Sequence, residues 1–159
     1  MTAIPAPVAV TARRFVLLAA LVAGTIDITY AILYYGAKGV PALRILQSIA
    51  SGLLGKEAFA GGFGVAMLGL ALHYGILLVA SAVFLEASRR VAWLRTRAVV
   101  AGVLFGLAIY AVMNFVVLPL SAYPFPMRFP LVTTLTGVLS HIAVGVAISL
   151  LTRRALAPA

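Results

Sequence analysis

Residues 68–86 read LGLALHYGILLVASAVFLE, an almost wholly apolar stretch that His73 interrupts near its middle. At about 1.5 Å per residue, a helix of this length crosses most of the roughly 30 Å hydrocarbon core of a bilayer. A second stretch, LTGVLSHIAVGVAISLL at residues 135–151, is interrupted by His141, and the chain contains only these two histidines. Both stretches predict membrane-spanning helices, and each helix must accommodate one imidazole.

The composition extends this interpretation to the whole chain. Of the 159 residues, 64% are hydrophobic and 9% are charged, and the mean hydropathy is +1.17. A soluble domain of this composition would present too few polar groups to water. The chain also has no cysteine, which excludes disulfides, thiolate nucleophiles, iron–sulfur clusters and zinc–thiolate sites. We therefore expect one integral membrane domain.

Four apolar segments are long enough to cross a bilayer as helices, and so short a chain has too few strands for a closed barrel. They cover residues 15–35, 62–86, 98–118 and 131–152. We predict an all-α, four-helix membrane bundle over residues 15–154. A disordered tail at residues 1–14 would precede it and a short tail at residues 155–159 would follow.

The basic residues are divided unequally between the two sides of this bundle. Eight lie on the side of the termini: Arg13, Arg14, Arg89, Arg90, Arg95, Arg97, Arg153 and Arg154. Four lie on the other side: Lys38, Arg44, Lys56 and Arg128. Because cytoplasmic ends carry the excess of Lys and Arg, we expect both termini in the cytoplasm. Topology then accounts for the net charge of +9, and no basic soluble face remains to bind nucleic acid.

The two connections on the outer side differ in character. Residues 41–55, PALRILQSIASGLLG, place Ile45, Ile49 and Leu53 at helical spacing, with Gln47 and Ser51 elsewhere on the wheel. This segment is too short to span, so it predicts an amphipathic helix in the interface or tucked into the mouth of the bundle. Residues 118–130, LPLSAYPFPMRFP, contain four prolines and predict a stiff cap with aromatic side chains at headgroup level. A lid over a cavity is the alternative interpretation of both segments.

Four stretches of the chain carry a resemblance to known proteins. They are GTIDITYAILYYG (24–36), ILQSIASGLLG (45–55), LGLALHYG (68–75) and YAVMNFVVLPLSAYP (110–124). These stretches resemble a family of small four-span bacterial inner-membrane proteins. More loosely, they are similar to the YagU-type inner-membrane proteins, which also place histidines within such helices. The resemblance covers roughly residues 15–154 and implies a multi-pass protein of the bacterial inner membrane, without implying an activity.

Each predicted span carries one strongly polar residue on a face of small residues, where helices pack closely in membranes. These residues are Asp27, His73, Asn114 and His141, and Tyr110 lies one turn before Asn114. Counting along the helices places both histidines near the bilayer centre, about 15 Å below the outer surface, with Asp27 at a similar level. Ionisable groups at that depth are costly unless they are paired or hydrated, which points to a functional site.

Several interpretations of this site remain open. Asp27, His73 and His141, with Asn114 and Tyr110, would bind or conduct a small ligand, an ion or a proton. Alternatively, Asp27 and the two histidines would hold a divalent metal, or the histidines would ligate a b-type haem. The same groups also fit hydrogen bonds that only fix helix packing.

The partners are less constrained than the location. Membrane lipids are expected, and a homo-oligomer or a larger membrane complex stays open. As an accessory subunit, the chain would use Gly102 and Gly106 of the third span as a packing surface. No nucleophile is paired with a base in a recognisable spacing, so we do not expect an enzyme.

Overall fold

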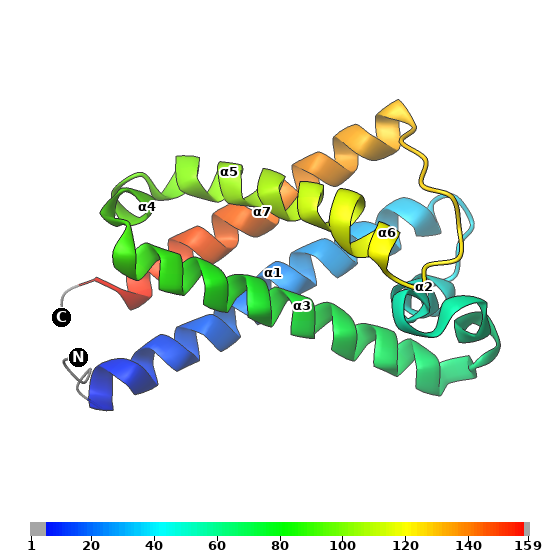
Figure 1. Cartoon of the computed structure of the whole chain (residues 1–159), viewed down its shortest axis with the longest axis horizontal. Coiled ribbons are helices and arrows are strands. Elements are labelled where there is room, and N and C mark those ends of the chain that lie inside the picture. The colour runs from blue at the N-terminus through cyan, green and yellow to red at the C-terminus, as the bar shows by residue number, and fades with distance from the viewer. Residues whose placement is uncertain (1–5, 158–159) are drawn as a thin grey trace.

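The computed structural model describes residues 6–157, with side chains from residue 13 onward, and these residues form helices and connections without a strand (Figure 1). The elements are α1 (Ala6–Gly36), α2 (Ala42–Leu54), the 3-10 helix η1 (Gly55–Ala60), α3 (Gly62–Arg90), α4 (Ala92–Thr96), α5 (Ala98–Val112), the π-helix η2 (Met113–Val117), α6 (Leu118–Leu120) and α7 (Leu131–Ala155). Four helical stretches are long and apolar enough to cross a membrane: Arg13–Gly36, Gly62–Arg90, Ala98–Leu120 and Leu131–Ala155. The all-helical fold with four candidate spans is therefore confirmed.

The first helix begins earlier than the sequence suggested. The structure describes α1 from Ala6, whereas the sequence led us to expect the first helix from residue 15 after a disordered tail. Pro7 falls in the first turn of α1, where the missing N–H of a proline costs the helix no hydrogen bond. At the other end, α7 continues to Ala155. Residues 1–5 and 158–159 lie outside the described residues.

The long helices pack closely in the half of the bundle that contains the C-terminal end of α7. There α5 lies directly on α7, because a Cβ on Gly106 would overlap the backbone of His141 and one on Gly145 would overlap Gly106. Ser149 Oγ adds a hydrogen bond of 2.7 Å to the carbonyl oxygen of Ala98. Gly102 faces the backbone of Val146 in the same contact. The glycines that we considered as a surface for a larger complex are therefore used inside the bundle.

At the opposite end, α2 packs against the start of α3, and residues 121–130 cross beside it (Figure 1). The backbones of α2 and α3 meet at Gly69, where a Cβ would overlap the carbonyl of Leu46. The backbone N–H of Ala122 donates to the carbonyl oxygen of Gly52 over 2.8 Å, which ties the proline-rich connection to α2. This end of the bundle is thus covered by two connected segments rather than by the four long helices themselves.

The orientation of α2 differs from a helix lying flat in the interface. Gln47 and Ser51, which we expected to face water, are 2% and 0% exposed. Gln47 Nε2 donates to the carbonyl oxygen of Gly62 over 3.0 Å, so the polar side of α2 faces α3. Its apolar side, with Ile45 and Ile49, faces inward beneath the connection. This arrangement matches the alternative in which the segment is tucked into the mouth of the bundle.

Candidate functional site

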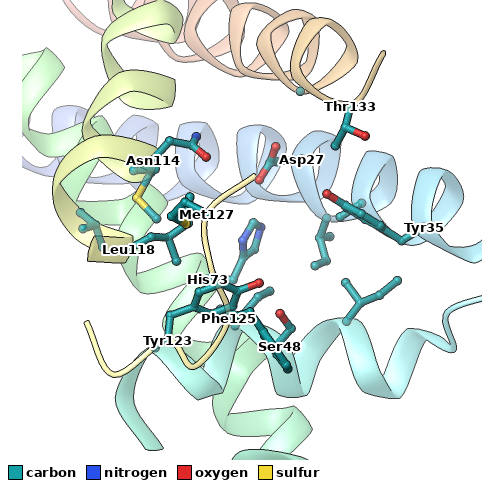
Figure 2. Close-up of a pocket in the computed structure, with 18 of the residues that line it drawn as sticks. Asp27, Tyr35, Ser48, His73, Asn114, Leu118, Tyr123, Phe125, Met127 and Thr133 are labelled. Carbon is teal, nitrogen blue, oxygen red and sulfur yellow. The ribbon is translucent and has the colours of Figure 1, made fainter. Parts of the chain in front are cut away.

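A cavity of about 1280 Å³ occupies the half of the bundle beneath α2 and residues 121–130 (Figure 2). Its walls come from α1, α3, α5 and α7, and its cover comes from α2 and the proline-rich connection. The five residues predicted as a site all line it: Asp27, His73, Tyr110, Asn114 and His141. The structure therefore brings the polar residues of all four spans to one space.

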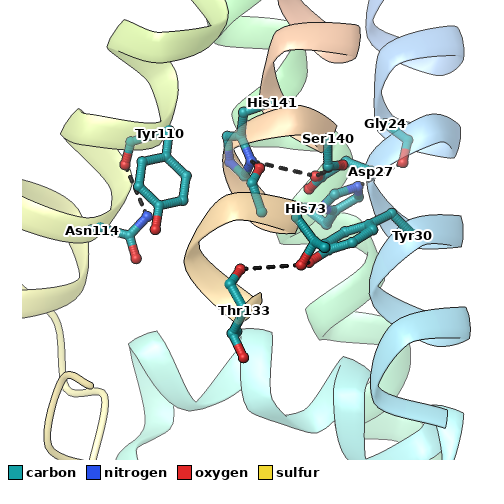
Figure 3. Close-up of polar contacts among 11 residues, drawn as sticks. Gly24, Asp27, Tyr30, His73, Tyr110, Asn114, Thr133, Ser140 and His141 are labelled. Atoms are coloured by element: carbon teal, nitrogen blue, oxygen red, sulfur yellow. Dashed lines mark hydrogen bonds and ion pairs between the residues drawn. The ribbon is translucent and has the colours of Figure 1, made fainter. Parts of the chain in front are cut away.

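The carboxylate of Asp27 is the centre of the polar contacts at the deep end of the cavity (Figure 3). Ser140 Oγ donates to Asp27 Oδ1 over 3.1 Å, and His141 Nδ1 lies 3.8 Å from the same oxygen. Both side chains are about one-fifth exposed. His141 Nδ1 also donates a hydrogen bond of 2.9 Å to the carbonyl oxygen of Gly137. The Nε2 atom of His141 is then left without a hydrogen bond from the described residues and can accept one.

His73 is held differently, although it lines the same cavity. Its ring is 6% exposed, and Nε2 donates to the carbonyl oxygen of Gly24 over 2.9 Å. Gly24 is required there, because a Cβ would lie 2.6 Å from the ring of Tyr74. Tyr74 in turn shares a hydrogen bond of 3.0 Å with Thr25. The His73 bond therefore joins α3 to α1, while its Nδ1 has no described partner.

Asn114 and Tyr110 lie where α5 changes its winding. Asn114 belongs to the π-helix η2, and its Nδ2 donates to the carbonyl oxygen of Tyr110 over 2.9 Å (Figure 3). The side chain thus supplies a donor at a turn where the backbone hydrogen bonds depart from the regular α-helical pattern. Such π-helical turns are frequent at functional sites. The ring of Tyr110 meets that of His141 edge to face, with centroids 5.3 Å apart.

The residues do not assemble as a metal centre. Across the part of the chain that the structure describes, no group of three His, Asp or Glu side chains is placed to hold a metal ion. For a bis-histidine haem, both rings would have to offer a free nitrogen across one gap. His141 keeps Nε2 free, whereas His73, whose Nε2 is bound to Gly24, keeps only Nδ1 free. The hydrogen bonds observed for both rings thus do not by themselves decide for or against a haem.

Sequence reasoning missed several hydroxyl groups around the cavity. Ser140 was not predicted as a site residue, because a serine beside a histidine in an apolar helix gives no separate signal. Its hydroxyl nevertheless donates to Asp27. Thr134 Oγ1 is buried in the cavity wall without a hydrogen-bond partner among the described residues. Tyr30 bonds Thr136 over 2.8 Å beside Asp27. The signal for this contact is that tyrosines four residues apart on α1, Tyr30 and Tyr34, meet threonines three residues apart on the antiparallel α7, Thr136 and Thr133.

The inner half of the bundle is packed with apolar side chains. Leu77, Phe84, Val144 and Ile148 form a buried cluster there with alanines of α1 and α5. Leu77 and Val144 also line the cavity, so they form its floor. The cavity therefore ends in the middle of the bundle, and this cluster separates it from the end where α7 terminates.

Comparison of the chain with protein-family models, with curated proteins and with solved structures finds no match in any of the three. The resemblance to small four-span inner-membrane proteins accordingly stays a prediction. The function has to be argued from the cavity alone.

Proposed function

We propose that this chain is a multi-pass protein of the bacterial inner membrane that binds a ligand in the cavity beneath α2, without catalysing a reaction. The observation that carries the proposal is that Asp27, His73 and His141 all line this one cavity. The cavity exceeds the roughly 300–1,000 Å³ of drug-sized ligand sites. A space of this size with hydrogen-bonding groups at its deep end is suited to hold a ligand of substantial length.

Binding is favoured over conduction by the floor of the cavity. A conducted ion or proton needs polar groups or water along its whole path, because bare charges are costly in an apolar interior. The cluster of Leu77, Phe84, Val144 and Ile148 interrupts that path. Asp27 and His141 then act as hydrogen-bonding partners at the closed end, with Ser140 holding the carboxylate in position.

Substituted-cysteine labelling tests the one-sided cavity, and the absence of native cysteine removes background. Asn114→Cys lies half-buried in the cavity wall, whereas Ser81→Cys is buried on α3 outside the cavity. A membrane-impermeant thiol reagent added to the outer face of spheroplasts should label Asn114→Cys and leave Ser81→Cys unmodified.

The same reagent added to inverted membrane vesicles should label neither position. Labelling of Asn114→Cys from the cytoplasmic face would mean a continuous aqueous path, and conduction would replace binding as the function. If Asn114→Cys is labelled from neither face, the cavity is not accessible and the proposal fails.

A further inference from the structure

The mouth of the cavity is unusually basic for the outer side of a membrane protein. Of the four cations that the sequence places on that side, Arg44, Lys56 and Arg128 line the cavity. The fourth, Lys38, is bound to the hydroxyl of Tyr34 over 2.7 Å. Cations on this side oppose the usual distribution that sets orientation, so topology does not explain their presence.

These three cations form no ion pair among the described residues, and the acid beside Lys56 in η1, Glu57, does not line the cavity. Glu86 takes part in ion pairs with Arg89 and Arg90 at the other end of α3. Within the described residues, no salt bridge joins Arg44, Lys56 or Arg128 to a carboxylate. The rim therefore carries three positive charges that are available to an anion.

Arg44 is also fixed in position at the rim. Its Nη1 donates to the carbonyl oxygen of Phe59 over 3.1 Å, and its guanidinium lies 4.9 Å from the centre of the Phe59 ring. The Phe59 ring packs on Phe125 of the proline-rich connection, with centroids 5.5 Å apart. One cation of the rim is thus built into the cover, which links α2, η1 and residues 121–130.

Below the rim, the lining is mostly aliphatic and aromatic. α2 contributes Ile45 and Ile49, α3 contributes Leu72 and Ile76, and the connection contributes Met127. Such a surface favours hydrocarbon over water. The only acid in the lining is Asp27 at the deep end, and its charge would repel an anionic headgroup. An amphiphile would consequently enter with its anionic head at the rim and its chains along the aliphatic walls, short of the carboxylate of Asp27, which Ser140 and His141 already contact.

We propose that the ligand is a phosphate-headed lipid, with the phosphate bound by Arg44, Lys56 and Arg128 and the acyl chains in the cavity. This inference rests on the proposed binding function and names the ligand class of the same site. Arg and Lys are the side chains that bind phosphate, and clusters of them near the membrane surface attract anionic lipids. The cavity volume and its apolar lining account for the chains.

Native mass spectrometry of the whole purified protein provides the test, with three probes offered separately. They are phosphatidylglycerol, diacylglycerol with the same acyl chains, and inorganic phosphate. We expect phosphatidylglycerol to be retained at least about tenfold more than diacylglycerol, because each basic contact adds to the affinity. Inorganic phosphate alone should not be retained, because it lacks the chains.

A triple variant, Arg44→Gln with Lys56→Gln and Arg128→Gln, should retain both lipids equally. The matched control removes three cations from the opposite side, Arg95→Gln with Arg97→Gln and Arg153→Gln, and should keep the preference. Circular dichroism and thermal unfolding in detergent establish that both variants are folded before lipid retention is compared.

The outcomes separate this inference from the proposal on which it rests. Equal retention of phosphatidylglycerol and diacylglycerol by the unmodified protein would overturn the phosphate site and leave ligand binding intact. Retention of phosphate alone, or loss of the preference in the control as well, would also overturn it. Ile49→Trp places an indole in the cavity wall, and its fluorescence is compared with that of the unmodified protein, whose one tryptophan is Trp93. If phosphatidylglycerol with brominated acyl chains does not quench the added fluorescence, the lipid lies outside the cavity and the inference fails, while the cysteine labelling still decides ligand access to the cavity.

Discussion

The two histidines of this chain occur in similar sequence contexts but have different roles. His73 donates to the carbonyl oxygen of Gly24, a contact between α3 and α1 that would stabilise the bundle without any ligand. His141 lies beside the carboxylate of Asp27, which Ser140 also contacts. Packing thus explains much of why His73 is present, whereas the group centred on Asp27 is the stronger candidate for ligand contact.

Single glycines, which have no side chain, let α5 approach α7 closely. Gly106→Ala should destabilise the protein by about 1–3 kcal/mol, because the added methyl group would overlap the backbone of His141. Thermal unfolding in detergent measures the change. Gly75→Ala in α3 is the control, since a Cβ there meets nothing within 4 Å, and it should be neutral or stabilising by up to about 1 kcal/mol. Equal effects of the two substitutions would contradict the close packing of α5 on α7.

The helix α2 acts as part of a cover because its partners lie on two sides. Its polar face binds α3 through Gln47, and its end is hydrogen-bonded to the proline-rich connection through Gly52. Periodicity correctly indicated an amphipathic helix. It could not indicate that the polar face would be buried, because the carbonyl oxygen that accepts from Gln47 Nε2 belongs to Gly62 of another helix.

A disulfide between α2 and residues 121–130 tests this cover. A Cβ on Gly52 would lie 3.8 Å from the Cβ of Ser121, which matches the usual separation in disulfides of about 3.8 Å. Gly52→Cys combined with Ser121→Cys should therefore cross-link on oxidation, seen as a single joined fragment after proteolysis between the two sites. Reduction should separate the fragments, and each single-cysteine variant serves as a control. Failure to cross-link under strong oxidation would place α2 away from the connection.

The whole molecule is closed at one end and hollow at the other. Glycine contacts and the apolar cluster hold α1, α5 and α7 together in the half that contains the C-terminal end of α7. Towards the other end the cavity opens between the long helices, and α2 with residues 121–130 covers it. The two ends of the bundle therefore differ, and the distribution of basic residues predicts which end faces the cytoplasm.

Reporter fusions test the orientation. Fusions after Arg90 and at the C terminus should report the cytoplasm, while a fusion after Ser48 should report the outside, because eight cations lie on the first side and four on the second. Removing positive charge provides the control. Replacing Arg95 and Arg97 with glutamine leaves six cations against four, so it should weaken the preference for cytoplasmic termini without reversing it. A C terminus found outside would invert the cavity and place its mouth at the cytoplasm.

The helices could be predicted from the sequence because each depends on its own residues. Long apolar runs locate the spans, and the prolines and glycines at residues 41, 55 and 130 lie at or beside helix ends. The polar residues of the site could be chosen for the same reason, since an ionisable group in an apolar run needs no neighbour to be noticed. The start of α1 was the exception, because a proline in a first turn is compatible with both a helix and a tail.

Only the tertiary structure decided which of these groups meet. The partnership of Ser140 and Asp27, the bond from His73 to Gly24 and the three cations around one mouth all join residues far apart in the chain. They depend on the distance and rotation between packed helices, which helical periodicity does not specify. Close glycine contacts at one end let the helices diverge at the other, and this divergence, which no single segment encodes, produces the cavity.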